Sequence, residues 1–336
     1  MVTRRRRLKQ TALGIAAFAA ALLVAGAAVN AWYEHQDDRR FPPRGRFIKV
    51  VDHKLLIDCT GQGPTVILEG GAGSSSLYFR RVQRALESSM RVCTYDRAGL
   101  GASEIGSGRY DIATSADELH ELLRAAGLPL PVIIVGHSLG ANIAAYYGAH
   151  YRADLAGLVL IDPGTPEDLF EDFKGSPTEA LAMTRCGWRC DAAAFAARVG
   201  VVRLAARHAG TVHMNADETA EYRAQLARPT NARATMGTIV FLPKSALQMK
   251  EVRTFGDLPV TVMASSALRK PEGKETHADV VKWRARYLEQ LRALAGASTH
   301  GRGPVIVPNT THLSVGLDDV GVNAIADEVK TLATRR

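Results

Sequence analysis

Ser138 lies at the centre of a Gly-x-Ser-x-Gly pattern, with Gly136 two residues before it and Gly140 two residues after it. Residues 131–135 are apolar and β-branched, which predicts a buried strand, and the Ala-rich residues 141–151 predict a helix. A serine between a strand and a helix sits on a tight, strained turn that exposes its hydroxyl, and small neighbours let the backbone pass without a clash. We therefore expect Ser138 to be a nucleophile.

His312 is the candidate general base for that serine. A serine hydroxyl is a weak nucleophile until a base removes its proton. His312 follows the last predicted strand, residues 304–307, in a short turn from which an imidazole can reach the serine. Its place downstream of Ser138 also fits the chain order serine, acid, histidine. His137, inside the serine turn, is expected to border the pocket and not to act as the base.

The elements around these residues predict an α/β fold. Alternating polar and apolar residues at 47–51 and 54–58 predict an opening hairpin. Six further strands are expected, at residues 65–68, 91–95, 131–135, 155–161, 258–263 and 304–307. Helices are expected at residues 114–126, 141–151, 278–295 and 320–332. Strands that alternate with helices form a parallel sheet, whose ligands bind at the carboxyl ends of the strands.

Residues 163–257 interrupt this alternation. They contain amphipathic segments at 191–208 and 216–227, separated by Gly, Pro and Asn residues. The stretch is too long for a loop. We expect a helical cap, inserted between two parts of the sheet domain at residues 47–162 and 258–336.

Four features together resemble the α/β-hydrolase superfamily. They are the serine turn, Glu69-Gly70-Gly71, Thr311-His312-Leu313, and the sequence Asp-Arg-Ala-Gly-Leu-Gly-Ala-Ser at residues 96–103. The resemblance implies an α/β-hydrolase fold, with a mostly parallel eight-stranded sheet flanked by helices and an inserted cap. Residues 58–66 and 91–93 look like those of a bacterial, N-terminally anchored subgroup of uncharacterised hydrolases. One departure is Glu69, because the superfamily often has His-Gly at that point.

The sequence leaves the acidic partner of His312 open. In the superfamily the acid commonly follows the strand that corresponds to residues 258–263, but no carboxylate stands at the expected distance here. Glu272, Glu275 and Asp279 come later. Some members place the acid one strand earlier, where Asp162 stands, although an Asp before Pro at a strand end is also a common turn former. We expect Asp162 to be the acid and keep Glu272 as the main alternative.

The resemblance also implies that the backbone amides of Gly71 and Leu139 form an oxyanion hole. The amide of Leu139 lies at the start of the predicted helix. Gly71 has no side chain, so its backbone can come close to a substrate. The glycine-rich residues 70–73 lack the Lys-Ser/Thr of a phosphate-binding loop and the spacing of a dinucleotide site. No cofactor is therefore expected. Asp96 and Arg97 are expected to support the loops structurally.

The N-terminal residues 1–33 are predicted to be a membrane anchor or signal segment. A basic cluster at residues 4–9 precedes an uncharged run at 11–29, which is near the ~20 residues that cross a bilayer. The positive-inside rule places the cluster in the cytoplasm and the catalytic domain on the outer side of the cytoplasmic membrane. Small residues at 25–27 leave a cleaved signal open, which would give a secreted or periplasmic protein. A buried helix is the third alternative.

The polar residues 34–46 contain two adjacent prolines and are expected to form a linker. The net charge of +8 is concentrated in the basic N-terminal cluster, and no basic stripe with interleaved aromatics follows. Nucleic-acid binding is therefore not expected.

Four cysteines suit an exported protein, because disulfides persist in oxidising compartments. The resemblance places Cys59 and Cys93 on neighbouring strands, where they lie side by side and can bond. Cys186 and Cys190 are four residues apart, which would also suit a metal pair, but no His or second Cys pair completes a site. No metal is expected.

Together these features predict a serine hydrolase that cleaves a carboxylic ester of a small molecule through an acyl-enzyme. An amidase or peptidase, or an acyltransferase, would use the same triad. A serine nucleophile argues against dehalogenase and epoxide hydrolase chemistry, which in this superfamily uses an aspartate. The contrasting class is a non-catalytic binding protein that keeps the fold.

Overall fold

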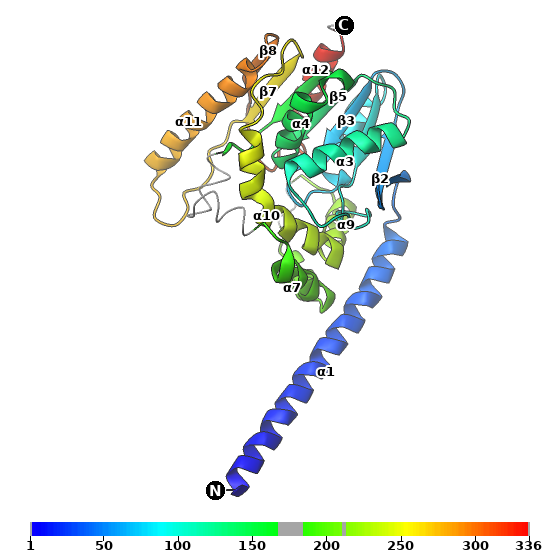
Figure 1. Ribbon diagram of the computed structural model, residues 1–336, viewed down its shortest axis with the longest axis vertical. Coiled ribbons are helices and arrows are strands. Elements are labelled where there is room, and N and C mark those ends of the chain that lie inside the picture. Colours follow the sequence, from blue (N-terminus) through cyan, green and yellow to red (C-terminus); the bar gives the residue numbers. More distant parts are fainter. Residues whose placement is uncertain (1, 167–183, 210–212, 335–336) are drawn as a thin grey trace.

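The computed structural model describes residues 2–166, 184–209 and 213–334 (Figure 1). Its centre is an eight-stranded sheet in the order β1-β2-β4-β3-β5-β6-β7-β8. Only β1 with β2 and β2 with β4 pair antiparallel, and the other neighbours are parallel. The strands are β1 (Arg46–Val50), β2 (His53–Thr60), β3 (Thr65–Glu69), β4 (Arg91–Tyr95), β5 (Val132–His137), β6 (Leu155–Ile161), β7 (Val260–Ser265) and β8 (Gly301–Val307). The predicted mostly parallel sheet is confirmed.

Helices cover both faces of this sheet, because the central strands are apolar on both sides. One face packs against α3 (Ile112–Ala125), α4 (Leu139–His150) and α11 (His277–Gly296). The other packs against α2 (Arg80–Leu86) and α12 (Asp319–Ala333), with the short η1 (Ser76–Phe79) before α2. Neighbouring residues of β3 show the alternation, since Ile67 belongs to the first core and Val66 and Leu68 to the second.

The described part of residues 163–257 is helical, with α7 (Gly187–Arg198), α8 (Val201–Ala206), α9 (Ala216–Leu226) and α10 (Pro229–Met249). The single helix expected at residues 191–208 is wrong, because Gly200 adopts a left-handed conformation with φ of 84° and separates α7 from α8. The first part of the expected cap, residues 167–183, lies outside the described residues. The longest helix in the described part of the cap, α10, begins with a proline at its first position, where the fixed φ of proline suits a helix and its missing amide hydrogen is not needed.

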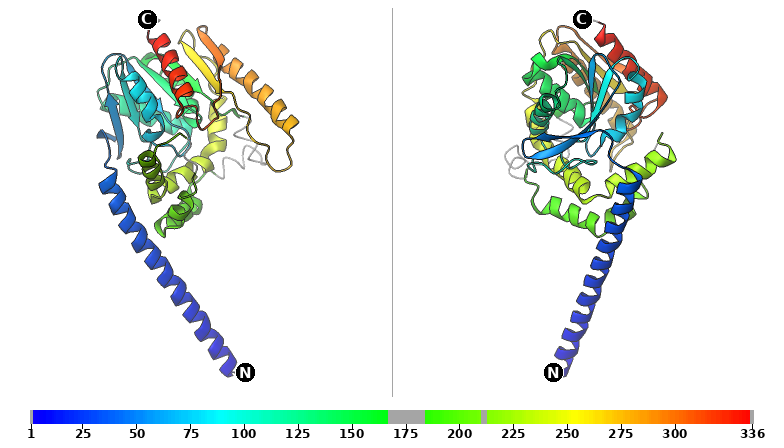
Figure 2. Two further views of the ribbon diagram at one scale, coloured as in Figure 1. Left: turned by 180° about the vertical axis from the view of Figure 1, so that it is seen from behind. Right: turned by 90° about the vertical axis from the view of Figure 1, so that its right-hand side faces the viewer.

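The N-terminal helix α1 (Val2–Arg40) projects away from the rest of the molecule (Figure 2). Among the described residues it is the one helix long and apolar enough to cross a membrane, with a mean hydropathy of 2.4 in its most apolar window. None of that window is buried, so the alternative of a buried helix is wrong. The expected linker at residues 34–46 is also wrong in its first half, because α1 continues to Arg40.

Contacts with the cap explain why α1 continues beyond the apolar run. Asp37 forms an ion pair of 2.8 Å with Arg203 of α8, and Asp38 pairs with Arg228 just before α10. Arg40 lies 3.0 Å from Asp217 of α9. These pairs stabilise a helical conformation that polar composition alone does not predict.

Cys59 and Cys93 stand directly opposite each other on the antiparallel strands β2 and β4. Their Cα atoms are 4.0 Å apart and their sulfur atoms are bonded, so the expected neighbourhood is confirmed. Cys186 and Cys190 also form a disulfide, at the start of α7. The second pair is therefore a disulfide and not half of a metal site.

Replacing Cys59 and Cys93 together by alanine is expected to lower the free energy of unfolding by about 2–4 kcal/mol, because their bond closes a long loop. Replacing Cys186 and Cys190 is the matched control and should cost less, since their sequence separation is only 4. Denaturant unfolding of both variants measures the difference. An equal or larger loss in the control would contradict this account.

Candidate active site

Ser138 occupies a strained turn between β5 and α4. Its φ is 55° and its ψ is −123°, in a region that residues with a side chain rarely adopt. Its backbone amide donates to the carbonyl of Ile161 at the end of β6, 2.9 Å away. A Cβ on Gly136 would lie 2.4 Å from the carbonyl oxygen of Gly140, and one on Gly140 would lie 2.3 Å from that of Glu69. The turn therefore requires both glycines of the pattern.

The structure brings His312 to this turn. It lies in the loop after β8, and its Nε2 is 3.1 Å from Oγ of Ser138. The loop is held by Thr310, whose hydroxyl donates to the carbonyl of Val307 at 2.8 Å and whose carbonyl accepts from Ala267 at 2.9 Å. The distance permits proton transfer between the serine hydroxyl and the imidazole.

Asp162 follows β6 and faces the other nitrogen of His312. Its Oδ2 is 3.5 Å from Nδ1 of His312, at the outer limit of a hydrogen bond. Its Oδ1 accepts from the amide of Ser265 at 3.1 Å. Burial acts to raise the pKa of Asp162, but the interactions with His312 and Ser265 outweigh it and hold that pKa below its ordinary value. Asp162 is therefore ionised at neutral pH.

The other carboxylates considered for this role have different surroundings. Glu272 is exposed, and its amide donates to Glu275 at 2.9 Å. Glu275 forms a two-pronged pair with Arg269, at 2.5 and 2.6 Å. Asp279 is part of the capping box at the start of α11. Among these four carboxylates, the described contacts join His312 to Asp162.

His137 has a positioning contact that the sequence did not reveal. Its Nε2 donates to the backbone carbonyl of His312 at 2.7 Å, and its ring stacks on Tyr78 with centroids 4.7 Å apart. Burial, together with the nearby His312, lowers the pKa of His137 to about 3, so its ring is neutral. The hydroxyl of Tyr78 accepts from the amide of Gly316 at 3.2 Å in the same loop. His137 thus supports the backbone of His312.

Both expected oxyanion donors lie next to Ser138. Leu139 is the first residue of α4, where a backbone amide has no partner within the helix. A Cβ on Gly71 would lie 3.3 Å from the Cβ of Ser138, so that loop runs alongside the serine. The helix N-terminus also favours negative charge at this point.

A buried ion pair holds the glycine-rich residues 70–73, the glycine loop, in place. Glu69 is fully buried and pairs with Arg97, and it also accepts from the hydroxyl of Tyr95. Arg97 donates further to the carbonyls of Gly70 and Gly71. Glu69 stands where the superfamily often has His-Gly, and here its carboxylate orients the arginine that fixes the loop. The expected structural role of Arg97 agrees with these contacts.

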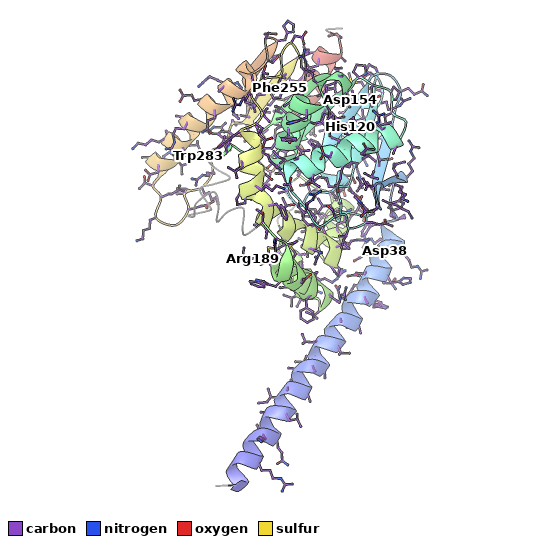
Figure 3. The ribbon with its side chains drawn as sticks, in the orientation of Figure 1. Asp38, His120, Asp154, Arg189, Phe255 and Trp283 are labelled. Carbon is purple, nitrogen blue, oxygen red and sulfur yellow. A yellow bond between two sulfur atoms is a disulfide. The ribbon has the colours of Figure 1, made fainter. Side chains whose placement is uncertain are left out.

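A cavity of about 740 Å³ opens beside Ser138, Asp162 and His312. Its lining combines apolar side chains with charged ones, namely Leu268, Trp283 and Leu313 with Arg269, Lys270 and Arg284. Trp283 lies on α11 (Figure 3). The side chain of His312 is 49% exposed, so the cavity is open to solvent. Within the described residues, no group of three or more His, Cys, Asp or Glu could hold a metal ion.

Comparisons with known proteins identify the fold. A family model described as the alpha/beta hydrolase fold matches residues 64–183. The uncharacterised protein YqjL of Bacillus subtilis is 34% identical over 101 residues, which cover 30% of this chain and 40% of that protein. The first curated relatives are matched over only 18% to 40% of their own length.

Solved structures agree over most of the chain. A thermophilic esterase from Thermogutta terrifontis matches with a TM-score of 0.59 and 20% identity, over 86% of this chain and 98% of the esterase. The epoxide hydrolase VrEH1 from Vigna radiata matches with a TM-score of 0.64 and 14% identity, over 87% of this chain and 98% of that structure. The chain therefore has the α/β-hydrolase fold, and the resemblance to α/β hydrolases is confirmed. The likeness to an N-terminally anchored subgroup stays a prediction.

Asp162→Asn is expected to slow the reaction of Ser138 with a fluorophosphonate probe by about a thousand-fold or more, because the imidazole loses its orientation and charge support. Glu272→Gln, at the rim of the same cavity, is the matched control and should react like the unmodified protein. The rate of probe labelling, followed by quenching samples at successive times, measures reactivity, and the thermal unfolding of both variants checks that they fold. A severe loss in the control with a mild loss in Asp162→Asn would assign the acid to Glu272.

Proposed function

We propose that this protein is a serine hydrolase that cleaves a carboxylic ester of a small molecule through an acyl-enzyme. The observation that carries the proposal is the 3.1 Å contact between Nε2 of His312 and Oγ of Ser138, with Asp162 on the opposite nitrogen. A nucleophile, a base and an orienting acid in this order are the parts that acyl transfer requires.

In the proposed mechanism, Oγ of Ser138 attacks the acyl carbon while Nε2 of His312 accepts its proton. The oxygen that becomes negative is stabilised by the amides of Gly71 and Leu139. The imidazolium, stabilised by Asp162, then gives its proton to the departing alcohol. Water attacks the acyl-enzyme with His312 again as base, and Ser138 is released. The exposure of His312 supports access of water and therefore hydrolysis over acyl transfer.

The nucleophile favours ester hydrolysis over the chemistry of the epoxide hydrolase neighbours. That chemistry uses an aspartate at the nucleophile position, whereas this chain has Ser138 there. The apolar side chains Leu268, Trp283 and Leu313 provide surface for an acyl or alcohol group of the substrate.

Ser138→Ala is expected to reduce ester hydrolysis by about a million-fold, because the nucleophile of the triad is lost. Ser265→Ala is the matched control, since Ser265 lines the same cavity but supports Asp162 through its backbone amide. Hydrolysis of a series of p-nitrophenyl esters of increasing chain length measures both variants. Activity of Ser138→Ala close to that of the unmodified protein would refute the proposed function.

We also propose that α1 anchors the catalytic domain on the outer side of the cytoplasmic membrane. The uncharged run at residues 11–29 spans about 28 Å as a helix, close to the thickness of the hydrocarbon core. The basic residues 4–9 precede it, and two disulfides fit an oxidising compartment. The domain comprises the core at 47–162 and 258–336 and the cap at 163–257.

Full-length protein is expected in the membrane fraction after an alkaline wash, with its domain accessible to protease added to spheroplasts. The physical reason is that an apolar helix of this length inserts stably, whereas peripheral contacts dissociate. A soluble periplasmic form of lower mass would show that the N-terminal segment is a cleaved signal and not an anchor. Recovery in the cytosol with an intact N-terminus would contradict both.

A further inference from the structure

The cap helices α7 and α8 expose large apolar side chains on their outer surface. Trp188, Phe195, Val201 and Leu204 are 76%, 53%, 55% and 59% exposed. Trp188 and Phe195 are seven residues apart on α7 and so share a helix face, as do Val201 and Leu204, three apart on α8. We call these four residues the α7–α8 face.

The corner between α7 and α8, at Val199 and Gly200, lies beside the apolar part of α1. A Cβ on Gly26 would lie 2.6 Å from the carbonyl oxygen of Val199, and one on Gly200 would lie 3.7 Å from the carbonyl oxygen of Gly26. Nε of Arg203 donates to Asn30 at 2.8 Å. The corner between α7 and α8 therefore contacts α1 through two glycines at close range.

The contact sets the height of the face relative to a bilayer. Gly26 lies within the apolar run, and that run ends at Val29, before the polar Asn30 and only about 5 Å further along the helix axis. Both views in Figure 2 show the cap helices as the part of the body nearest the N-terminal half of α1. If α1 crosses a membrane, the α7–α8 corner therefore lies at the outer boundary of the hydrocarbon core, and the α7–α8 face extends from that corner.

The charges around the face suit anionic lipid. Four exposed arginines lie in or next to the two helices, Arg185, Arg189, Arg198 and Arg207. The one acidic residue of the described segment 184–209 is Asp191, and it already pairs with Arg233. Arg189 lies on α7 (Figure 3). Apolar tips bordered by arginines are typical of helices that lie in the headgroup region of a membrane.

Two of the three aromatic residues of α1, Trp32 and Tyr33, lie about two helical turns beyond the contact at Gly26. Trp32, 58% exposed, follows Val29, the last residue of the apolar run, by three residues. Tyr33 lies under the guanidinium of Arg203, 5.2 Å from the ring centroid. Tryptophan and tyrosine are enriched where a helix passes through the interface of a bilayer. The interface marked by these residues coincides with the α7–α8 corner.

We propose that the α7–α8 face is a second membrane-contacting surface, which inserts into the outer leaflet of an anionic bilayer beside α1. This inference rests on the proposed anchoring of α1. In this arrangement the protein contacts the membrane at two places, through α1 and through the α7–α8 face of the cap.

The test is lipid quenching of a fluorophore on the full-length chain in vesicles of phosphatidylcholine and phosphatidylglycerol. Cysteines of the described residues are all in disulfides, so one added cysteine can be labelled. Leu204→Cys probes the face, Leu22→Cys probes the middle of α1, and Val281→Cys on α11 is the exposed control. Spin-labelled acyl chains are expected to quench the first two labels and leave the third unchanged.

The outcomes distinguish a failure of the membrane-contacting face from a failure of the proposed anchoring by α1. Quenching at residue 22 with no more quenching at 204 than at 281 would overturn the membrane-contacting face and leave the anchor intact. No quenching at residue 22 would overturn both. Phe195→Glu with Leu204→Glu should expose the chain near Arg198 and Arg207 to trypsin in vesicles, with circular dichroism confirming the fold. Unchanged trypsin resistance would also contradict the inference.

Discussion

The site depends on two strained strand ends that the sheet holds side by side. The backbone of both Ser138 and Asp162 has a positive φ, 55° and 44°, although neither residue is a glycine. Such conformations cost about 1–3 kcal/mol each and persist only where their surroundings fix them. Here the amide of Ser138 donates to Ile161 and that of Asp162 donates to Met263, each at 2.9 Å. The ladder from β5 through β6 to β7 thus extends into the turns, and His312 enters from β8 beyond it.

The glycine loop after β3 depends on a second constraint, the buried pair of Glu69 and Arg97. A buried carboxylate or guanidinium alone would be costly, whereas the pair also satisfies the carbonyls of Gly70 and Gly71. The loop is therefore rigid where it passes Ser138. In the proposed mechanism, an amide donor that is fixed in this way lowers the reorganisation needed when charge develops on a substrate oxygen.

The cap and α1 are joined by charged contacts, and the cap also contacts the chain just after the glycine loop, where the hydroxyl of Ser75 donates to Gln225 of α9 at 2.5 Å. Asp37 and Asp38 of α1 pair with Arg203 and Arg228 of the cap, so the orientation of α1 is coupled to the helices above the sheet. A membrane around α1 would in this way restrict the cap as well. The physical link between α1 and the rest of the described chain is this set of charged contacts and the close approach at Gly26.

Much of this arrangement follows from local sequence. The alternation of apolar strands with helices predicted the parallel sheet, because a helix that crosses over the sheet brings the next strand back in the same direction. The glycines around Ser138 predicted the turn, because the turn depends on neighbours in the chain. Three matters were decided only by tertiary structure: the approach of Asp162 to His312, the support of His312 by His137, and the continuation of α1 to Arg40. Each depends on contacts between residues that are far apart in the sequence, such as Asp162 and His312. No periodicity or spacing encodes such contacts, because the sheet order and the packing of the cap create them.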